Sequence, residues 1–240
     1  MSTLPPKRVR PNYALAARTA ILDAAESEFA EHGFAGARSD AIAKASGYNS
    51  ALIFHYFGDK LALYTEVVRR ADQALRFHQR NVLAPLLETE GSAATVEAVQ
   101  RVLEQLVNAY FDFVIEHPRF IRVLLWEQAN GWRTFAHIAS RFAAEDAAIF
   151  QRFFEQARQA GILRSDFAPL VQMTLILQVC IAYQSFLPLY QMTLAPGQES
   201  NPEYNQVTNA ETGRDYIVSF VVNGMIDTMA GTPSFLTGQA

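Results

Sequence analysis

The sequence predicts an all-α protein with a short N-terminal helical module followed by a larger helical domain. Apolar residues recur every three or four positions along most of the 240-residue chain, and the alternation typical of strands is almost absent. Half of the residues are apolar, and 2 Trp, 9 Tyr and 17 Phe contribute aromatic side chains. This supply is ample for a buried core, so general disorder is excluded.

Two longer helices bound the N-terminal module. The first is expected over about residues 13–32, because Gly33 provides a left-handed helix end. The second begins at the helix cap Asp59 and connects the module to the rest of the chain over about residues 59–81. The predicted division is a basic flexible tail (1–12), an N-terminal module (13–60) and a C-terminal helical domain (61–240).

Between these helices the sequence predicts two short helices and a tight turn. Ser39 is expected to cap the first short helix, which ends at Gly47, and Asn49 the second, which ends at Gly58. Two short helices joined by such a turn form a helix-turn-helix. Its second helix can present its N-terminal residues to base edges in the major groove of DNA.

The charges are divided unevenly along the chain. Residues 1–80 carry 11 Lys/Arg against 8 Asp/Glu, a net charge of +3, whereas residues 81–240 carry 9 against 16, a net charge of −7. The first 20 residues hold four cations and no acid. A basic end of this kind is expected where a protein contacts phosphates, although a solvated tail would give the same counts.

Residues of the N-terminal module also carry a family resemblance. It rests on the helix-turn-helix, the run LIFHYFGDK from Leu52 to Lys60, and Phe29, Gly33 and Phe34 at the end of the first helix. Together they resemble the TetR family of bacterial transcription regulators, most strongly over residues 20–68. The segment 161–166 resembles a junction that precedes the family's dimer helices. The resemblance implies a homodimeric repressor that reads palindromic double-stranded operator DNA and is released by a small, largely apolar effector.

Carried over position by position, the resemblance places particular residues at the DNA. Ser50, Ala51 and Phe54 fall where the family contacts bases or the adjacent backbone. Ser39, Tyr56 and Lys60 fall where it contacts phosphate. Phe54 stands where the family usually has a tyrosine, so a hydroxyl directed at phosphate is missing. This departure leaves the operator sequence undetermined.

Further residues of the module have a structural and a functional interpretation. Asn49 is first a helix cap and could also contact a base, and Tyr48 either packs or faces the groove. Lys60 at a helix start opposes the helix dipole, which a bound phosphate would explain. Asp40 would repel phosphate and is interpreted as a helix-start residue.

The remaining helices are expected to form the effector-binding and dimerisation domain. They are predicted over about residues 96–117, 118–128, 132–160, 171–190 and 215–229. The candidate effector contacts are Tyr110, Phe113, Trp126, Gln128, Phe150, Gln178 and Tyr183, each of which could instead be ordinary core. The segment 195–214 is interpreted as a mobile arm or a cover, and Asp166 as the cap of the 171–190 helix.

The helices 171–190 and 215–229 are predicted to form a homodimer interface. Both are apolar around more of their circumference than one core contact requires, and Ala182 and Gly224 are small enough for close approach. The apolar stretch 171–192 contains several polar residues, so we interpret it as a helix packed in protein rather than in a membrane.

Several alternatives are weighed against a regulator. The single cysteine, Cys180, permits no intrachain disulfide or thiolate metal cluster, and with no apolar signal segment at the N-terminus a cytoplasmic protein without a cofactor is expected. A small all-α enzyme with a regulatory DNA-binding module would need a catalytic constellation, which the five histidines do not provide. An architectural DNA-binding protein without effector would not need about 160 further residues. Binding of a small molecule that changes DNA affinity would distinguish a regulator from an architectural protein. Catalytic turnover of that molecule would identify an enzyme.

Overall fold

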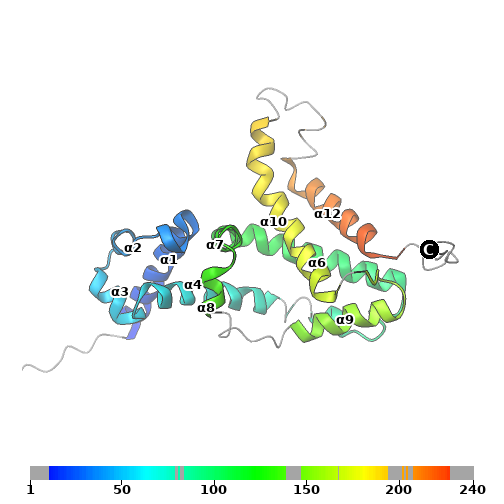
Figure 1. The fold of residues 1–240 in the computed structure, drawn as a ribbon, viewed down its shortest axis with the longest axis horizontal. Helices are drawn as coiled ribbons and strands as arrows, with labels where there is room; N and C mark the ends of the chain where they lie inside the picture. The colour runs from blue at the N-terminus through cyan, green and yellow to red at the C-terminus, as the bar shows by residue number, and fades with distance from the viewer. Residues whose placement is uncertain are drawn as a thin grey trace, which may run out of the picture. The chain divides into compact units, whose positions relative to one another are not determined.

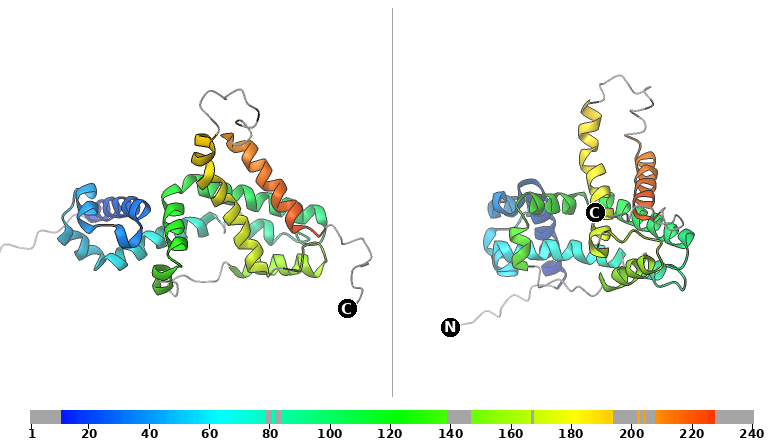
Figure 2. Two further views of the ribbon diagram at one scale, coloured as in Figure 1. Left: turned by 45° about the horizontal axis from the view of Figure 1, so that its top comes forward. Right: turned by 45° about the vertical axis from the view of Figure 1, so that its right-hand side comes forward.

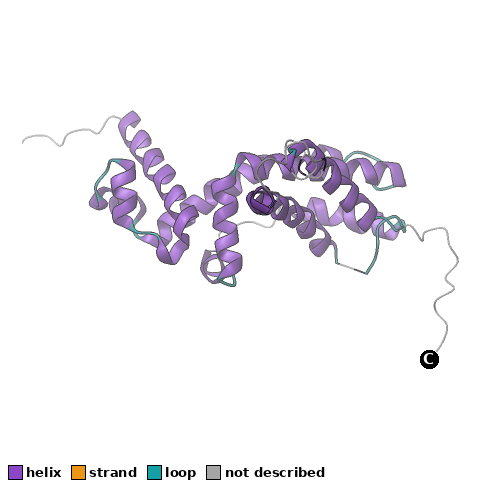
Figure 3. Ribbon diagram, turned by 90° about the horizontal axis from the view of Figure 1, so that it is seen from above, coloured by secondary structure: helices purple, strands orange, loops and turns teal. Residues whose placement is uncertain are grey.

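The computed structural model describes residues 11–78, 81, 84–138, 147–166, 168–193, 202, 204 and 208–227. Within these ranges the regular elements are all helices (Figure 3), which confirms the predicted all-α class. An isolated antiparallel bridge joins Leu163 to Ile226. The chain forms two compact units, an N-terminal unit of Met1–Ala74 with His117–Phe142 and a C-terminal unit of Leu75–Glu116 with Ala143–Ala240.

The N-terminal unit combines the helix-turn-helix with helices from later in the chain (Figure 1). Its helices are α1 (Pro11–Gly36), α2 (Ser39–Ser46), α3 (Ser50–Phe57), α4 (Lys60–His78, of which residues up to Ala74 belong here), α7 (Pro118–Ala129) and α8 (Arg133–Ile138). Both α2 and α7 pack extensively on α1. The compact unit is therefore larger than the predicted module 13–60, because α7 packs on α1 and carries α8 with it.

The core of this unit forms where α1, α2, α3 and α4 meet. Phe29, Ile42, Ile53 and Tyr64 are almost completely buried there. Gly33 has a φ of 65°, so α1 breaks at the predicted position before one more turn to Gly36. Burial of large apolar side chains stabilises such a unit by about 1.5–3 kcal/mol per residue.

Two of the three predicted helix caps in this unit are confirmed. The Asn49 side chain accepts a hydrogen bond from the Leu52 amide at 2.8 Å, and the Asp59 side chain accepts one from the Ala62 amide at 2.7 Å. The prediction for Ser39 is wrong. Arg38 occupies the cap position of α2 without a side-chain hydrogen bond, and Ser39 is the first helical residue.

The C-terminal unit is built around α6. Its helices are the last turn of α4, α5 (Ala84–Leu87), α6 (Val96–Glu116), α9 (Ala147–Gln159), α10 (Pro169–Thr193) and α12 (Ala210–Met225). Helices α10 and α12 both cross α6 and contact one another (Figure 2). The buried face of α6 provides most of this core, including Val99, Leu103, Phe111 and Phe113.

Two predicted helix starts in the C-terminal unit are wrong. Helix α12 begins at Ala210 rather than at residue 215, because the Asn209 side chain accepts hydrogen bonds from the amides of Glu211 and Thr212. Residues 210–214 are therefore helical, and not part of the predicted loop 195–214. Most of that loop, and the tail up to residue 10, lie outside the described residues. Asp166 is paired with Arg164 instead of capping α10, which begins at Pro169.

Helix α10 leaves much of its apolar surface uncovered within one chain. Among the described helices it is the one long and apolar enough to cross a bilayer, and 22% of its most apolar window is buried. Leu175 and Phe186 are 45% and 50% exposed. The side chains of Gln172 and Thr174 nevertheless hydrogen-bond to backbone carbonyls of the chain itself.

Candidate nucleic-acid interface

Helix α3 is anchored by one face and exposes the other. Ile53 and Phe57 are 1% and 8% exposed, as their spacing predicts. Ala51 and Phe54 lie on the exposed face, Phe54 with 44% of its surface accessible. An aromatic ring without a core contact is available for the sugar or the thymine methyl group of a DNA site.

Ser50, the first residue of α3, forms a hydrogen bond to α2. Its hydroxyl donates to Oδ1 of Asp40 at 3.3 Å. Asp40 is exposed in the first turn of α2, where a carboxylate interacts favourably with the helix dipole. The sequence pattern indicated the placement of Ser50 but not this partner, because residues ten positions apart meet only through the angle between α2 and α3.

Lys60 is held at the start of α4 by contacts with the end of α1. Its Nζ donates to the carbonyl oxygen of Ala35 at 3.4 Å and lies 5.0 Å from the centre of the Phe34 ring. Partial burial lowers the pKa of Lys60, and the charge of Glu28 offsets part of that effect. The ammonium group is thus ordered before DNA is bound, which reduces the entropy lost when it pairs with a phosphate.

The other predicted DNA contacts differ in exposure. Asn49 is exposed, whereas Ser39 and Tyr56 are half-buried. Tyr48 is also half-buried and meets Tyr13 of α1 edge to face, with 6.3 Å between ring centres. Of the two interpretations left open for Tyr48, the structure shows packing against α1, and contact with the groove stays a prediction.

Ion pairs join α1 to α4. Arg18 pairs with Glu66, and Arg70 pairs with Asp23. Arg69 binds the same Glu66 carboxylate at 2.8 Å, and this bond is the main reason why the pKa of Glu66 lies below its usual value. The pairs of Arg18 and Arg70 fix the direction of α4 against α1.

Helix α7 is attached to α1 and α4 by two specific contacts. The indole N–H of Trp126 donates to the Ala30 carbonyl at 3.2 Å, and its ring lies against Gly33, where a Cβ atom would be only 3.0 Å from the ring. The buried Glu127 accepts hydrogen bonds from the Tyr64 hydroxyl at 2.7 Å and from the Phe135 amide at 2.9 Å.

The sequence did not indicate Glu127 as a functional residue or as the partner of Tyr64. The available signal was that Glu127 is the one acid of α7, a helix that also carries Arg119 and Arg122, since a carboxylate on the buried face of a helix must have partners. Burial, reinforced by the bond to Glu127, raises the pKa of Tyr64 well above its ordinary value. The tyrosine therefore stays a neutral donor.

The predicted effector contacts fall into different units. Trp126 and Gln128 belong to the N-terminal unit, and Tyr110, Phe113, Phe150, Gln178 and Tyr183 to the C-terminal unit. Within the C-terminal unit the first three are at most 3% exposed. Gln178 and Tyr183 on α10 are half-buried, and the Tyr183 hydroxyl lies 3.3 Å from the Asn209 carbonyl oxygen.

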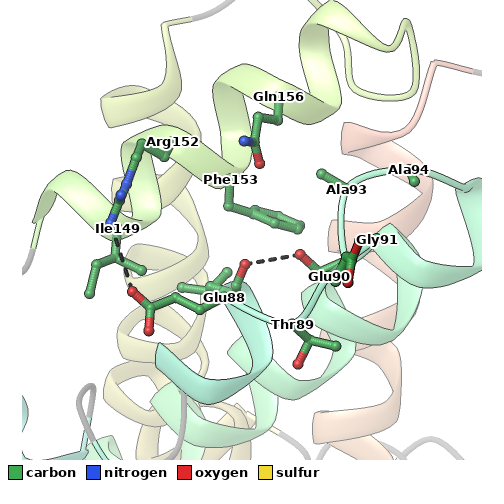
Figure 4. Close-up of a pocket in the computed structure, with 12 residues that line it drawn as sticks. Glu88, Thr89, Glu90, Gly91, Ala93, Ala94, Ile149, Arg152, Phe153 and Gln156 are labelled. Carbon is green, nitrogen blue, oxygen red and sulfur yellow. Dashed lines mark hydrogen bonds and ion pairs between the residues drawn. The ribbon is translucent and has the colours of Figure 1, made fainter.

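A cavity of about 590 Å³ lies elsewhere in the C-terminal unit (Figure 4). The turn after α5 and one face of α9 form its walls. Leu87, Ala93 and Phe153 contribute apolar surface, and Arg152 is 3.7 Å from Glu88 across the opening. None of the predicted effector contacts lines it. Within the described part of the chain, no group of three His, Cys, Asp or Glu side chains could hold a metal ion.

Comparison with known proteins agrees with the site. Residues 21–67 match the family described as bacterial regulatory proteins, tetR family, and residues 100–211 match the tetracyclin repressor-like C-terminal domain. These two matches cover about two thirds of the chain. The second match lies outside the helix-turn-helix, so it extends the likeness to the helical domain.

Individual relatives align over most of the chain. The HTH-type transcriptional repressor NicS of Pseudomonas putida is 24% identical over 180 residues, 74% of this chain and 80% of its own. The HTH-type transcriptional repressor SCO4008 of Streptomyces coelicolor is 26% identical over 192 residues, 78% of this chain and 88% of its own. The structure of Salmonella enterica GusR shares the fold with a TM-score of 0.57 and 20% identity, covering 90% of this chain and 97% of that one.

The two family matches divide between the helix-turn-helix and the helical domain that follows it, as the two parts of the predicted architecture do. The helix that would read DNA is exposed on one face and anchored on the other. The chain therefore belongs to the TetR family of bacterial regulatory proteins and is a DNA-binding transcription regulator.

Proposed function

We propose that this regulator is a cytoplasmic repressor that binds a palindromic operator as a homodimer and is released by a small molecule. The observation that carries the proposal is the exposed face of α3 with Ala51 and Phe54, in the same unit as the Lys60 ammonium group, which is held by the Ala35 carbonyl and the Phe34 ring. Base-reading and phosphate-binding groups are then displayed together. The relatives named above as repressors support this direction of regulation.

The proposed division of labour follows the sequence. Residues 13–60 bind DNA, and residues 61–240 bind the effector and dimerise. Selection of binding sites from random double-stranded DNA with the full chain should give an inverted repeat. Transcription from a promoter overlapping that site should fall when the protein is added. Enrichment of a single unrepeated half-site would contradict the dimeric reading, and increased transcription would contradict repression.

The dimer interface is proposed on α10 and α12. Tyr216 and Phe220 on α12 are 70% and 57% exposed, and apolar side chains of α10 are exposed as well. Exposed apolar surface of this extent usually marks an interface, and a second copy presents the same surface about a two-fold axis. Phe220→Asp should reduce the mass in sedimentation to the 26.8 kDa of one chain. As the control, Ile115→Asp changes an exposed apolar residue on α6 and should leave the dimer intact. A wild-type protein that is monomeric at micromolar concentration would contradict the interface.

The effector is proposed to bind in the C-terminal unit. Two locations are open: the predicted contacts on α6, α9 and α10, and the cavity beside Phe153, whose volume is typical of small-molecule sites. A thermal-shift screen of small aromatic and aliphatic molecules would supply a ligand for comparing Gln178→Ala with Arg152→Ala. Loss of affinity in only one variant assigns the location. A ligand that binds without changing operator affinity would contradict its role as effector.

A further inference from the structure

We infer that Asp40 is a base-reading residue and that the Asp40–Ser50 pair selects a cytosine amine in each operator half-site. This inference rests on the proposed DNA-binding function. It starts from the hydrogen bond in which the Ser50 hydroxyl donates to Oδ1 of Asp40 at 3.3 Å. The bond joins the first turn of α2 to the first residue of α3, the end of the recognition helix that enters the groove.

The direction of this bond determines what the pair offers to DNA. A serine hydroxyl has one proton, and here Asp40 accepts it. The remaining groups of Ser50 are lone pairs, and an ionised carboxylate has only acceptors. The pair therefore presents acceptors alone, although an isolated serine could serve either as donor or as acceptor.

Only some bases match a surface made of acceptors. In the major groove guanine shows the acceptors N7 and O6, which such a surface repels. Cytosine and adenine each show an amine, but the adenine amine lies beside the acceptor N7. The cytosine N4 amine is flanked by one acceptor, O6 of the paired guanine, whereas the adenine amine lies between its own N7 and O4 of the paired thymine. Cytosine is consequently the base that fits best.

The charge of Asp40 supports a role in specificity rather than affinity. A carboxylate at a DNA-facing helix start is repelled by phosphates, so it weakens binding to any sequence. Glu66 shows the contrasting arrangement, because its carboxylate is neutralised by Arg18 and Arg69. Asp40 is exposed and forms no ion pair with another described residue, and its hydrogen bond leads to a residue of the recognition helix.

The test is the base preference of full-length variants in selections from random double-stranded DNA. Wild-type protein should select cytosine at one position of each half-site, with a preference of about five- to tenfold over other bases. Asp40→Ala should lose the preference at this position alone, and its affinity for random DNA should rise about two- to fivefold because one negative charge is gone. Asp40→Asn should shift the position towards adenine, which an amide contacts through N6 and N7.

Ser50→Ala is the matched control, because it removes the hydroxyl and keeps the carboxylate. It should retain a weaker cytosine preference. If Asp40 has only a structural role, Asp40→Ala should melt at a lower temperature, lose affinity for random DNA and keep every base preference. That result would overturn the inference. If the wild-type protein selects no sequence at all, the proposed DNA-binding function itself fails, and the two failures are thus distinguished.

Discussion

The hydrogen bond between Tyr64 and Glu127 gives a stability prediction for the N-terminal unit. Tyr64→Phe removes one hydroxyl and leaves the ring contacts with Phe29 and Phe34 in place, whose centres lie 5.0 Å and 5.2 Å from that of Tyr64. The substitution therefore changes one hydrogen bond and almost no packing. Glu127, only 4% exposed, then keeps a single described partner for its carboxylate, the Phe135 amide.

The expected loss follows from the chemistry of the pair. A hydrogen bond to a charged group contributes about 1.5–3 kcal/mol to the free energy of unfolding, and a buried acceptor left without its donor costs a similar amount. We expect Tyr64→Phe to lower that free energy by about 2 kcal/mol. Glu127→Gln should cost less, about 1 kcal/mol, because its amide oxygen can still accept from the Phe135 amide while its NH2 donates to the Tyr64 hydroxyl oxygen, so that bond to a charged group becomes a neutral one.

Urea unfolding of the two single variants and the double variant measures this coupling. The double variant should lose clearly less than the sum of the two single losses, because both substitutions act on the same bond. Operator affinity should fall as well, since the pair connects α7 to α4 within the DNA-binding unit. Additive losses, or a loss below about 0.5 kcal/mol for Tyr64→Phe, would refute the argument.

Three further outcomes follow from single residues. Lys60→Ala should weaken binding to operator and random DNA alike and reduce the salt slope by about one unit, whereas a changed base preference with an unchanged slope would contradict the phosphate assignment. Gly213→Ala should destabilise the fold by about 1–3 kcal/mol in thermal melts, because its Cβ would lie 2.1 Å from the Tyr183 ring, and an unchanged melting temperature would contradict this steric argument. Burial raises the pKa of Cys180 to about 12, so the folded protein should resist thiol alkylation at pH 8. Stability should then fall as the pH rises above about 9, where the unfolded thiol ionises and the folded one does not, and a flat profile up to pH 11 would contradict this.

The sequence predicted local features well because local chemistry determines them. Asn49 caps α3 and Gly33 breaks α1, and both depend on a few neighbouring residues. The failures involve competition between nearby residues. Asn209 outcompetes Asp215 as the start of α12 because its side chain accepts from two amides, and Asp166 is already engaged by Arg164. Contacts between distant segments, such as that of Tyr64 with Glu127, leave no periodic pattern in the sequence, so they could not be predicted from it.

The interpretation of the N-terminal charge changes once these distant contacts are known. The net charge of +3 over residues 1–80 treats every cation as available to DNA. In the folded unit Arg18 and Arg70 are paired with acids across α1 and α4 and stabilise the angle between these helices, and Arg69 is paired with Glu66 within α4, so all three attract phosphate only weakly. Lys60 is different, because its described contacts are a carbonyl oxygen and an aromatic face, neither of which cancels its charge. Some cations of residues 1–80 therefore stabilise the fold, and others are available to phosphates. The salt dependence of DNA binding should reflect the number of unpaired cations and not the net charge of this segment.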